Sequence, residues 1–414
     1  MIKKLSNNIR LYPVYCLFGW DLLFYYSIAT LFLVTIKEIS VSQIVLIDSI
    51  AALAVVVFQI PVRIIASRFT NPKNIQIGLF CWIISMLLIM ISPNIMFIVV
   101  GRMFFSLGSC FKANSEVSIL HEPLNKLRKP NWFTIVFGKG LSSYMYVNAV
   151  GAVFAGILFS INPYIPMAIT IICLTIAFAT ALKFEETAKL KKKLTVFESI
   201  YELKKGIKHI GSSRRLKMLF LYTLSYFSII GITTSYVGVY LNESNINPIV
   251  FSLIYTVLSL TQGICSKLEY KIENKFKKKT LTVFSITHVV TFILVGLVGI
   301  ITRNIFIVVV LFVVQYGLAI LDRVARNKYI TNFTSSGIRE SILSINSTIE
   351  YFSKFIGLLF ASYLLKHFNI NISYLILGVL YLIVMLIVTK TMRNKLGLMP
   401  EQYSINERLY DPYK

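Results

Sequence analysis

The sequence has few charged residues, few cysteines and few histidines, and each shortage excludes a class of protein. Only 14% of its 414 residues are charged, whereas soluble proteins average about a quarter. The five cysteines all lie in apolar stretches without zinc-ligand spacing, and the four histidines form no HxxxH or HExxH pattern. These absences exclude a disordered chain, a disulfide-rich secreted protein and a cytosolic enzyme. They also predict that there is no metal site and no cofactor.

Apolar sequence, in contrast, is abundant. Hydrophobic residues make up 56% of the chain, and they occur in runs of about 18 or more, a length typical of transmembrane helices. We therefore predict an all-α integral membrane protein, because lipid offers no partners to backbone groups outside helices. The first run is too long for a signal-peptide core, so we expect it to be retained. The twelve predicted spans are 12–36, 42–66, 75–92, 93–119, 132–160, 164–183, 215–241, 248–268, 280–301, 304–328, 339–365 and 371–391.

Basic residues are sorted between alternate connections. With the N-terminus placed in the cytoplasm, the inner segments hold 35 of the 42 lysines and arginines, and the outer connections hold only Lys37, Arg303 and Lys366. Cytoplasmic connections of membrane proteins carry such an excess. The pattern predicts a multi-pass protein of the cell membrane with both termini cytoplasmic. Topology explains the basic excess, so no nucleic-acid partner is expected.

The longest polar segment divides the chain into two halves of six spans each. We predict an N-terminal six-helix bundle (1–183), a cytoplasmic basic amphipathic linker (184–214), a pseudo-symmetric C-terminal bundle (215–391) and a cytoplasmic tail (392–414). Apolar residues recur every three or four positions in the linker, which indicates an amphipathic helix. That helix either lies on the bilayer with its lysines toward anionic headgroups or is a solvated connection. We expect a monomer.

Charged residues inside a membrane are costly, so each suggests a function and requires a partner. At 1.5 Å per residue, Asp21, Arg102 and Glu350 lie about 14 to 16 Å from a span end, close to the midplane of a core of roughly 30 Å. Transporters bind substrates and coupling ions at this depth. Asp21 either binds and releases a proton or pairs permanently with Arg102. Lys354 follows Glu350 by four residues, which predicts either a structural ion pair or a binding site.

A second group of charges is expected nearer the inner surface. Lys112 and Glu116 have i,i+4 spacing, Lys139 lies at a similar depth on the next span, and Asp322 and Arg326 repeat the spacing in the other half. These side chains either reach solvent along their apolar stems or form an inner gate that holds the two halves closed.

Twelve spans in two sets of six resemble the major facilitator superfamily along essentially the whole chain. That family carries the motif Gly-x-x-x-Asp-Arg-x-Gly-Arg-Lys between spans two and three. The positions that fit its pattern are Pro61, Ala66, Arg68 and Gly78, and those that depart from it are Arg63, Ser67 and Thr70. The resemblance implies a charged latch between Arg68 and Glu116, although the motif's aspartate is missing.

Three further segments are similar to members of the same family. Span four matches an arginine-containing motif at Arg102 and Gly108, and in proton-coupled members that arginine is linked to the proton site. Gly151 and Gly156 match part of an exporter motif in which glycines pack helices, and Arg339 begins a run similar to bacterial efflux proteins.

The resemblance implies a secondary transporter that moves a small molecule by alternating access, with a proton or cation as coupling ion. We expect a proton-coupled exporter of the multidrug or antibiotic type. An importer or facilitator of a small solute and a non-transporting membrane sensor are the alternatives. An enzyme acting on lipid would require paired carboxylates or His/Asp clusters at a membrane face, which the sequence does not show.

Overall fold

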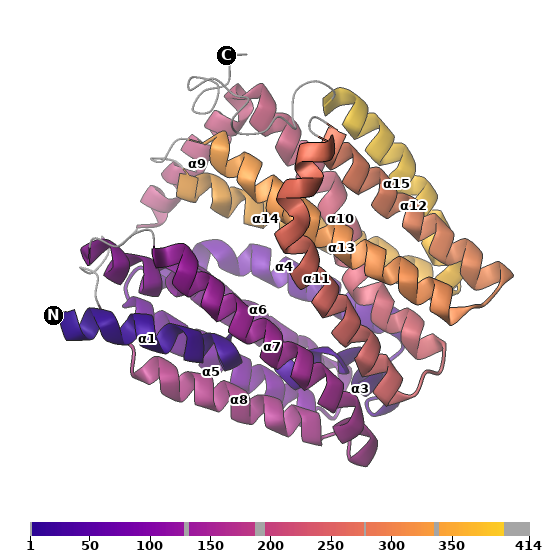
Figure 1. Cartoon of the computed structure of the whole chain (residues 1–414), viewed down its shortest axis with the longest axis horizontal. Coiled ribbons are helices and arrows are strands. Elements are labelled where there is room, and N and C mark those ends of the chain that lie inside the picture. The colour runs from indigo at the N-terminus through magenta and orange to yellow at the C-terminus, as the bar shows by residue number, and fades with distance from the viewer. Residues whose placement is uncertain (1, 128–131, 187–194, 277–278, 335–338, 393–414) are drawn as a thin grey trace. The chain divides into compact units, whose positions relative to one another are not determined.

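The computed structural model describes residues 2–127, 132–186, 195–276, 279–334 and 339–392. Within these ranges the secondary structure is helical and no β-strand occurs. Twelve segments of these described ranges are long and apolar enough to cross a membrane, so the predicted all-α membrane fold is confirmed and the chain is a multi-pass membrane protein. The helices (Figure 1) are α1 (Ile2–Gly19), α2 (Leu23–Tyr26), α3 (Ala29–Thr35), α4 (Val41–Ala66), α5 (Asn71–Ile91), α6 (Ile95–Lys126), α7 (Trp132–Ile161), α8 (Ile165–Leu182), α9 (Val196–Ser212), α10 (Arg214–Glu243), α11 (Pro248–Phe276), α12 (Thr280–Ile301), α13 (Ile305–Asn332), α14 (Arg339–His367) and α15 (Ile370–Met392).

Contacts group the helices into two compact units. Unit 1 comprises residues 1–40, 50–196 and 245–259, and unit 2 comprises residues 41–49, 197–244 and 260–414. Two helices, α4 and α11, therefore contribute to both units. The domain boundaries predicted from the sequence stay a prediction. Part of the linker (187–194) and nearly all of the tail (393–414) lie outside the described residues.

The first predicted span, 12–36, is present as Ser6–Thr35, but it is not one continuous helix. Residues 20–22 are not helical, and a second interruption separates α2 from α3. At the first break, the side chain of Asp21 accepts a hydrogen bond from the backbone N–H of Leu22 at 2.8 Å. Short polar side chains compete in this way with helical hydrogen bonds. The break lies beside Gly19, which has a low helix propensity.

Glycines allow close helix contacts in unit 1. A Cβ atom on Gly108 of α6 would lie 2.6 Å from Cδ1 of Trp82 on α5. Similarly, a Cβ atom on Gly156 of α7 would lie 2.8 Å from Cα of Ile249, in the part of α11 that belongs to unit 1. Because lipid is as apolar as the helices, membrane bundles associate through such close packing. Gly151 is less constrained, since its nearest neighbours are ring atoms of Phe24 at 3.7 Å.

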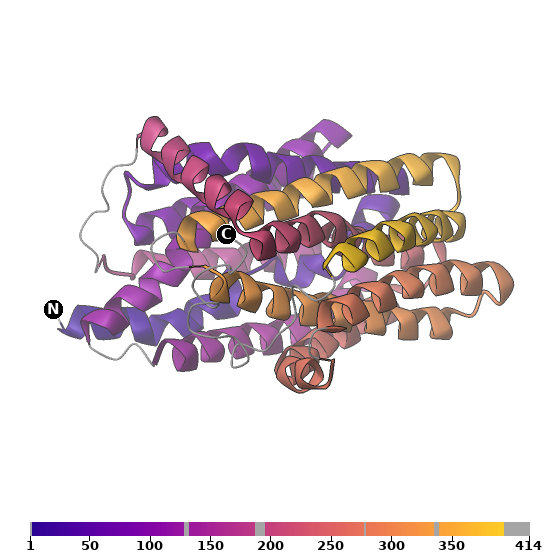
Figure 2. The same ribbon diagram turned by 90° about the horizontal axis from the view of Figure 1, so that it is seen from above.

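In unit 2, α12 runs beside α13 and α15 in both views (Figures 1 and 2). Hydrogen bonds attach the first nine residues of α4 to this unit. The hydroxyl of Ser235 donates to Oδ2 of Asp48 at 2.7 Å, and that of Ser49 donates to the carbonyl of Phe355 at 2.9 Å. Asp48 is thus a further carboxylate inside a span, and a serine of α10 satisfies one of its oxygens.

The amphipathic helix predicted in the linker is present as α9. Gly206 faces Ile345 of α14, and a Cβ atom on this glycine would lie 2.6 Å from Cδ1 of the isoleucine. The opposite face exposes Phe197 and Tyr201 together with Lys204. Its contact with anionic lipid stays a prediction.

Candidate functional site: two centres of buried charge

The break in the first span forms the first centre, in unit 1. A helix interruption leaves backbone groups without intrahelical partners. Nζ of Lys112 on α6 donates to the carbonyl oxygen of Gly19, the last residue of α1. The hydroxyl of Tyr144 on α7 lies 3.3 Å from Oδ2 of Asp21, toward which it donates. Side chains from two neighbouring helices therefore hold the broken segment, an arrangement that transporters use for ion and substrate sites.

Lys112 is the central cation of this site. It is 2% exposed, and its Nζ lies 3.3 Å from Oε1 of Glu116 and 3.2 Å from the ring centroid of Trp82. Glu116 also accepts a hydrogen bond from the hydroxyl of Tyr15 on α1. The ion pair that the spacing predicts is present, but Lys112 does not reach solvent along its stem. Gly78 leaves the room that its side chain fills, because a Cβ atom there would collide with Cγ of the lysine.

Lys112 acts electrostatically on Asp21, as does Arg102. The sequence predicted Arg102 in this role and assigned Lys112 to a separate inner cluster. The two residues are ten positions apart on α6, about 15 Å along the helix, so depth along the helix placed Lys112 too far from Asp21. Because α1 ends at Gly19, the carbonyl of this residue has no intrahelical partner and accepts from the lysine. Residue spacing along a helix cannot show this contact.

The second centre lies in unit 2, between α13 and α14. Nε of Arg326 donates to Oδ2 of Asp322 at 3.1 Å, and Nη1 donates to Oε1 of Glu350. Tyr222 of α10 donates its hydroxyl to Oδ1 of Asp322 at 2.8 Å, and Asn346 donates from Nδ2 to Oε1 of Glu350 at 2.9 Å. One guanidinium thus bridges two carboxylates in a buried, hydrogen-bonded network, in which charged hydrogen bonds are strongest.

Two expectations change at this centre. Asp322 and Arg326 are paired as predicted, but they are 0% and 1% exposed and do not reach solvent. Glu350, for which the spacing predicts Lys354 as partner, is held by Arg326 instead. The stem of Lys354 packs on Gly231 of α10, where a Cβ atom would lie 2.6 Å from Cγ of the lysine. The crossing of α13 over α14 brings Arg326 to Glu350, 24 residues away, and helix periodicity contains no information about it.

A family model described as Major Facilitator Superfamily matches residues 11–322. The chain belongs to the Major Facilitator Superfamily. It is a transporter and not an enzyme. A comparison with curated proteins finds no match.

Solved structures of transporters share the fold. The POT family transporter PepTSo has a TM-score of 0.73 at 10% identity, covering 95% of this chain and 98% of that one. The nucleoside transporter NupG has a TM-score of 0.72 at 14% identity, covering 95% and 100%. The D-xylose-proton symporter has a TM-score of 0.68 at 11% identity, covering 96% and 98%.

The superfamily latch expected between Arg68 and Glu116 is not formed in the described part of the chain. Arg68 is exposed, and no hydrogen bond or ion pair joins it to Glu116. A different carboxylate, that of Glu186, binds the connection between α4 and α5. Its Oε2 accepts a hydrogen bond from the backbone N–H of Asn71 at 2.7 Å, at the start of α5. A carboxylate is favourable at a helix N-terminus. The Glu185-Glu186 pair that begins the linker was its only signal in the sequence.

Lys139 also stays apart from the first centre. It is exposed on α7, and within the described ranges no ion pair links it to Glu116. The same ranges contain no group of three or more His, Cys, Asp or Glu side chains that could hold a metal ion.

A neutral polar network in unit 2 was not predicted. The hydroxyl of Tyr226 lies 2.7 Å from Nδ1 of His288, and Oγ1 of Thr233 lies 3.0 Å from Nε2. Thr233 donates its own proton to the carbonyl of Ile229, which assigns the imidazole proton to Nε2.

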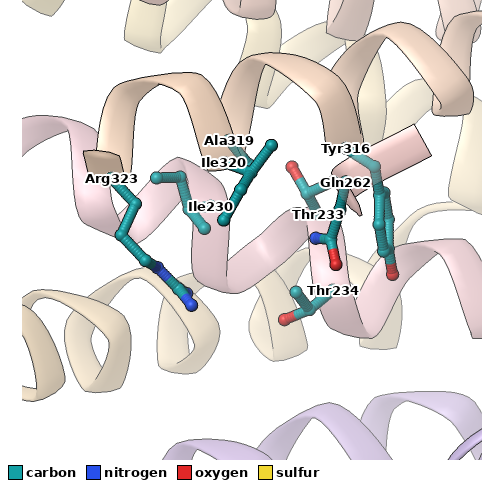
Figure 3. A pocket seen from close by; sticks show the side chains of 8 residues that line it. All are labelled: Ile230, Thr233, Thr234, Gln262, Tyr316, Ala319, Ile320 and Arg323. Carbon is teal, nitrogen blue, oxygen red and sulfur yellow. The ribbon is translucent and has the colours of Figure 1, made fainter. Parts of the chain in front are cut away.

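Thr233 also borders a cavity of about 30 Å³, large enough for a water molecule. Figure 3 shows its lining: Ile230, Thr233, Thr234, Gln262, Tyr316, Ala319, Ile320 and Arg323.

Proposed function

We propose that this superfamily member is a proton-coupled secondary active transporter that exports a small molecule, with Asp21 as the proton acceptor. The interruption of the first span at Asp21 is the observation that carries the proposal. A carboxylate at a helix break lies in backbone that regular helical hydrogen bonds do not hold, so a change in its charge can change the conformation of the span. Transporter folds place coupling sites at discontinuous helices near the bilayer midplane.

The contacts of Asp21 suggest how protonation acts. In the charged state, Asp21 attracts Lys112 and Arg102 and accepts hydrogen bonds from Leu22 and Tyr144. Protonation removes the attraction to both cations. Lys112 then keeps Glu116 and the carbonyl of Gly19 as partners, so α1 stays attached to α6 while the segment beyond the break is released. A ligand or proton shifts a conformational equilibrium only through such a difference in interactions between two states.

We assign the second centre to the substrate and to gating. Glu350 and Lys354 form part of the wall that the substrate contacts, and Asp322 and Arg326 fasten α13 to α10 and α14. Opening of the transporter would require these ion pairs to rearrange. Lys112 and Glu116 have the corresponding role in unit 1. We also propose that both termini are cytoplasmic, which the distribution of basic residues supports.

An importer is the second candidate. The resemblance of the sequence to exporter motifs favours export, whereas structures with the same fold include the D-xylose-proton symporter. The two candidates require opposite directions of proton flow relative to substrate, and this difference makes them separable by experiment.

The first test begins with a growth-inhibition screen of cells that express the protein against a broad compound panel. A compound whose toxicity falls is then used in proteoliposomes. An exporter that exchanges substrate for protons accumulates it when the vesicle interior is acidic, and a symporter does so when the exterior is acidic. We expect Asp21→Asn to abolish gradient-driven accumulation in either case and to preserve counterflow, because asparagine keeps a hydrogen-bond acceptor but cannot exchange a proton.

Asp48→Asn is the matched control, since Asp48 is also a carboxylate within a span and the asparagine oxygen can still accept from Ser235. This variant should retain gradient-driven transport. Full gradient-driven activity of Asp21→Asn would remove Asp21 from the mechanism.

A further inference from the structure

Two buried polar atoms of the second centre have no hydrogen-bond partner: Nη2 of Arg326 and Oδ1 of Asn346. Arg326 is 1% exposed and Asn346 is 4% exposed. An unsatisfied buried polar group costs about 1–3 kcal/mol, and native proteins retain few of them. Two such atoms in one network therefore indicate an occupant that supplies their missing partners.

The two atoms belong to side chains that meet at one point. Nη1 of Arg326 and Nδ2 of Asn346 both donate to the same oxygen, Oε1 of Glu350. Because a carboxylate oxygen can only accept from the amide, the orientation of Asn346 is fixed, and its Oδ1 is an acceptor directed elsewhere. Next to Glu350 the centre thus offers one free donor and one free acceptor. The side chain of Glu350 is 17% exposed, so this is the side from which the centre can be reached.

The charges at the centre restrict what can bind. The guanidinium of Arg326 is already shared by two carboxylates, Asp322 and Glu350, so an anionic group would meet no uncompensated positive charge. A cation would meet the free N–H of the guanidinium, which repels it. A group that both accepts and donates without carrying charge satisfies both atoms, and hydroxyl and carboxamide groups have this property.

We propose that Nη2 of Arg326 and Oδ1 of Asn346 form a subsite for an uncharged hydroxyl or carboxamide group of the transported molecule. The proposal rests on the proposed transport function and adds the chemical class of the substrate to it. The hydroxyl or amide of the substrate accepts from Arg326 and donates to Asn346. A site built in this way discriminates strongly against an analogue that lacks the polar group, because its own buried atoms then stay unpaired.

The test is a thermal-unfolding assay of the purified full-length protein in detergent with four probes at equal concentration. Mannitol represents neutral hydroxyls and nicotinamide a neutral carboxamide, while benzoate and tetraphenylphosphonium represent anions and cations. We expect a neutral probe to raise the Tm, and the more effective of the two identifies the group. We expect Asn346→Leu, which removes the acceptor, to weaken that probe's apparent affinity by about tenfold or more.

Asn371→Leu is the matched control, because Oδ1 of Asn371 is also buried without a partner, but on α15; its response to the probe should equal that of the parent protein. If Asn346→Leu does not yield a monodisperse protein, Asn346→Ala replaces it. Three results would overturn the subsite. They are a rise in Tm with the charged probes only, a rise in Tm with a neutral probe that survives loss of the Asn346 amide, and no change in Tm with any probe. The last result would indicate that water alone fills the site. The response should persist in Asp21→Asn, so the subsite can stand even if proton coupling at Asp21 fails.

Discussion

The two units carry a charged pair at the same spacing but in opposite order. On α6 the cation comes first, as Lys112 followed by Glu116, and on α13 the acid comes first, as Asp322 followed by Arg326. In both units a tyrosine from an earlier helix of the same unit donates its hydroxyl proton to the acid. Tyr15 of α1 donates to Glu116, and Tyr222 of α10 donates to Asp322. The common element is therefore an acid held by a cation and a phenol.

The units differ in what else the cation binds. Lys112 donates to the backbone carbonyl of Gly19, where the first span is broken. Arg326 instead binds a second carboxylate, Glu350, and α10 runs unbroken from Arg214 to Glu243. In unit 1 the cation compensates for a discontinuity in the backbone, whereas in unit 2 it ties two side chains on separate helices. The first arrangement therefore secures an interrupted span, and the second joins α13 to α14.

The largest expected effect comes from removing each cation. Arg326→Met leaves Asp322 and Glu350 buried beside each other without a cation, which costs about 3–5 kcal/mol. Lys112→Met leaves the Gly19 carbonyl without its donor and removes the cation beside Glu116 and Asp21, but Glu116 keeps the hydrogen bond from Tyr15 and Asp21 keeps those from Leu22 and Tyr144, so we expect about 1.5–3 kcal/mol. Thermal or denaturant unfolding of the purified variants measures both. Arg323→Met, which changes an exposed neighbour on α13, is the control.

A triple variant sharpens this test. Asp322→Asn, Arg326→Met and Glu350→Gln together remove every charge of the network, and buried ionic networks replaced as a whole often lose little stability. We expect the triple variant to be more stable than Arg326→Met alone. Equal losses for the Lys112 and Arg326 variants would contradict the distinction between the two centres.

Removing the tyrosine hydroxyls should also destabilise unit 2 more than unit 1, but by a smaller amount than removing the cations. Tyr222→Phe removes the donor to Asp322, whose side chain is 0% exposed, and we expect a loss of about 2–3 kcal/mol. Tyr15→Phe removes the donor to Glu116, whose side chain is 19% exposed and can be hydrated, so we expect about 1 kcal/mol. Unfolding midpoints give the comparison, with Tyr146→Phe as control because Tyr146 is 70% exposed. A larger loss in the Tyr15 variant would indicate that exposure does not decide the cost.

The sequence predicts features that repeat along a single helix, namely the apolar spans and the i,i+4 charge pairs. It does not predict contacts between helices. Hydropathy located all twelve spans within a few residues, and i,i+4 spacing identified the pairs at Lys112 and Asp322. The break at Asp21 was missed, because a hydropathy window averages over three non-helical residues. The link from Arg326 to Glu350 and the cap that Glu186 places on α5 depend on how distant segments meet, which charge spacing along one helix does not encode.

The smallest expected effect concerns two matched connections. Glu38 in unit 1 and Arg303 in unit 2 have positive φ angles of 53° and 51° just after a helix end, where glycine is favoured. Replacement by glycine relieves about 1 kcal/mol of left-handed strain in the folded protein. It also costs about 0.5–1 kcal/mol, because glycine loses more backbone entropy on folding. We expect Arg303→Gly to raise stability by at most about 0.5 kcal/mol. Glu38→Gly should gain less, because the adjacent Lys37 donates to the carbonyls of Met90 and Ser92 at 2.9 and 3.0 Å, and a more flexible backbone weakens that anchor. Unfolding of Glu38→Gly in a Lys37→Met background measures the contribution of this anchor. The gain in unfolding free energy should then equal that of Arg303→Gly. If Glu38→Gly still gains less, the Lys37 hydrogen bonds are not the cause of the difference.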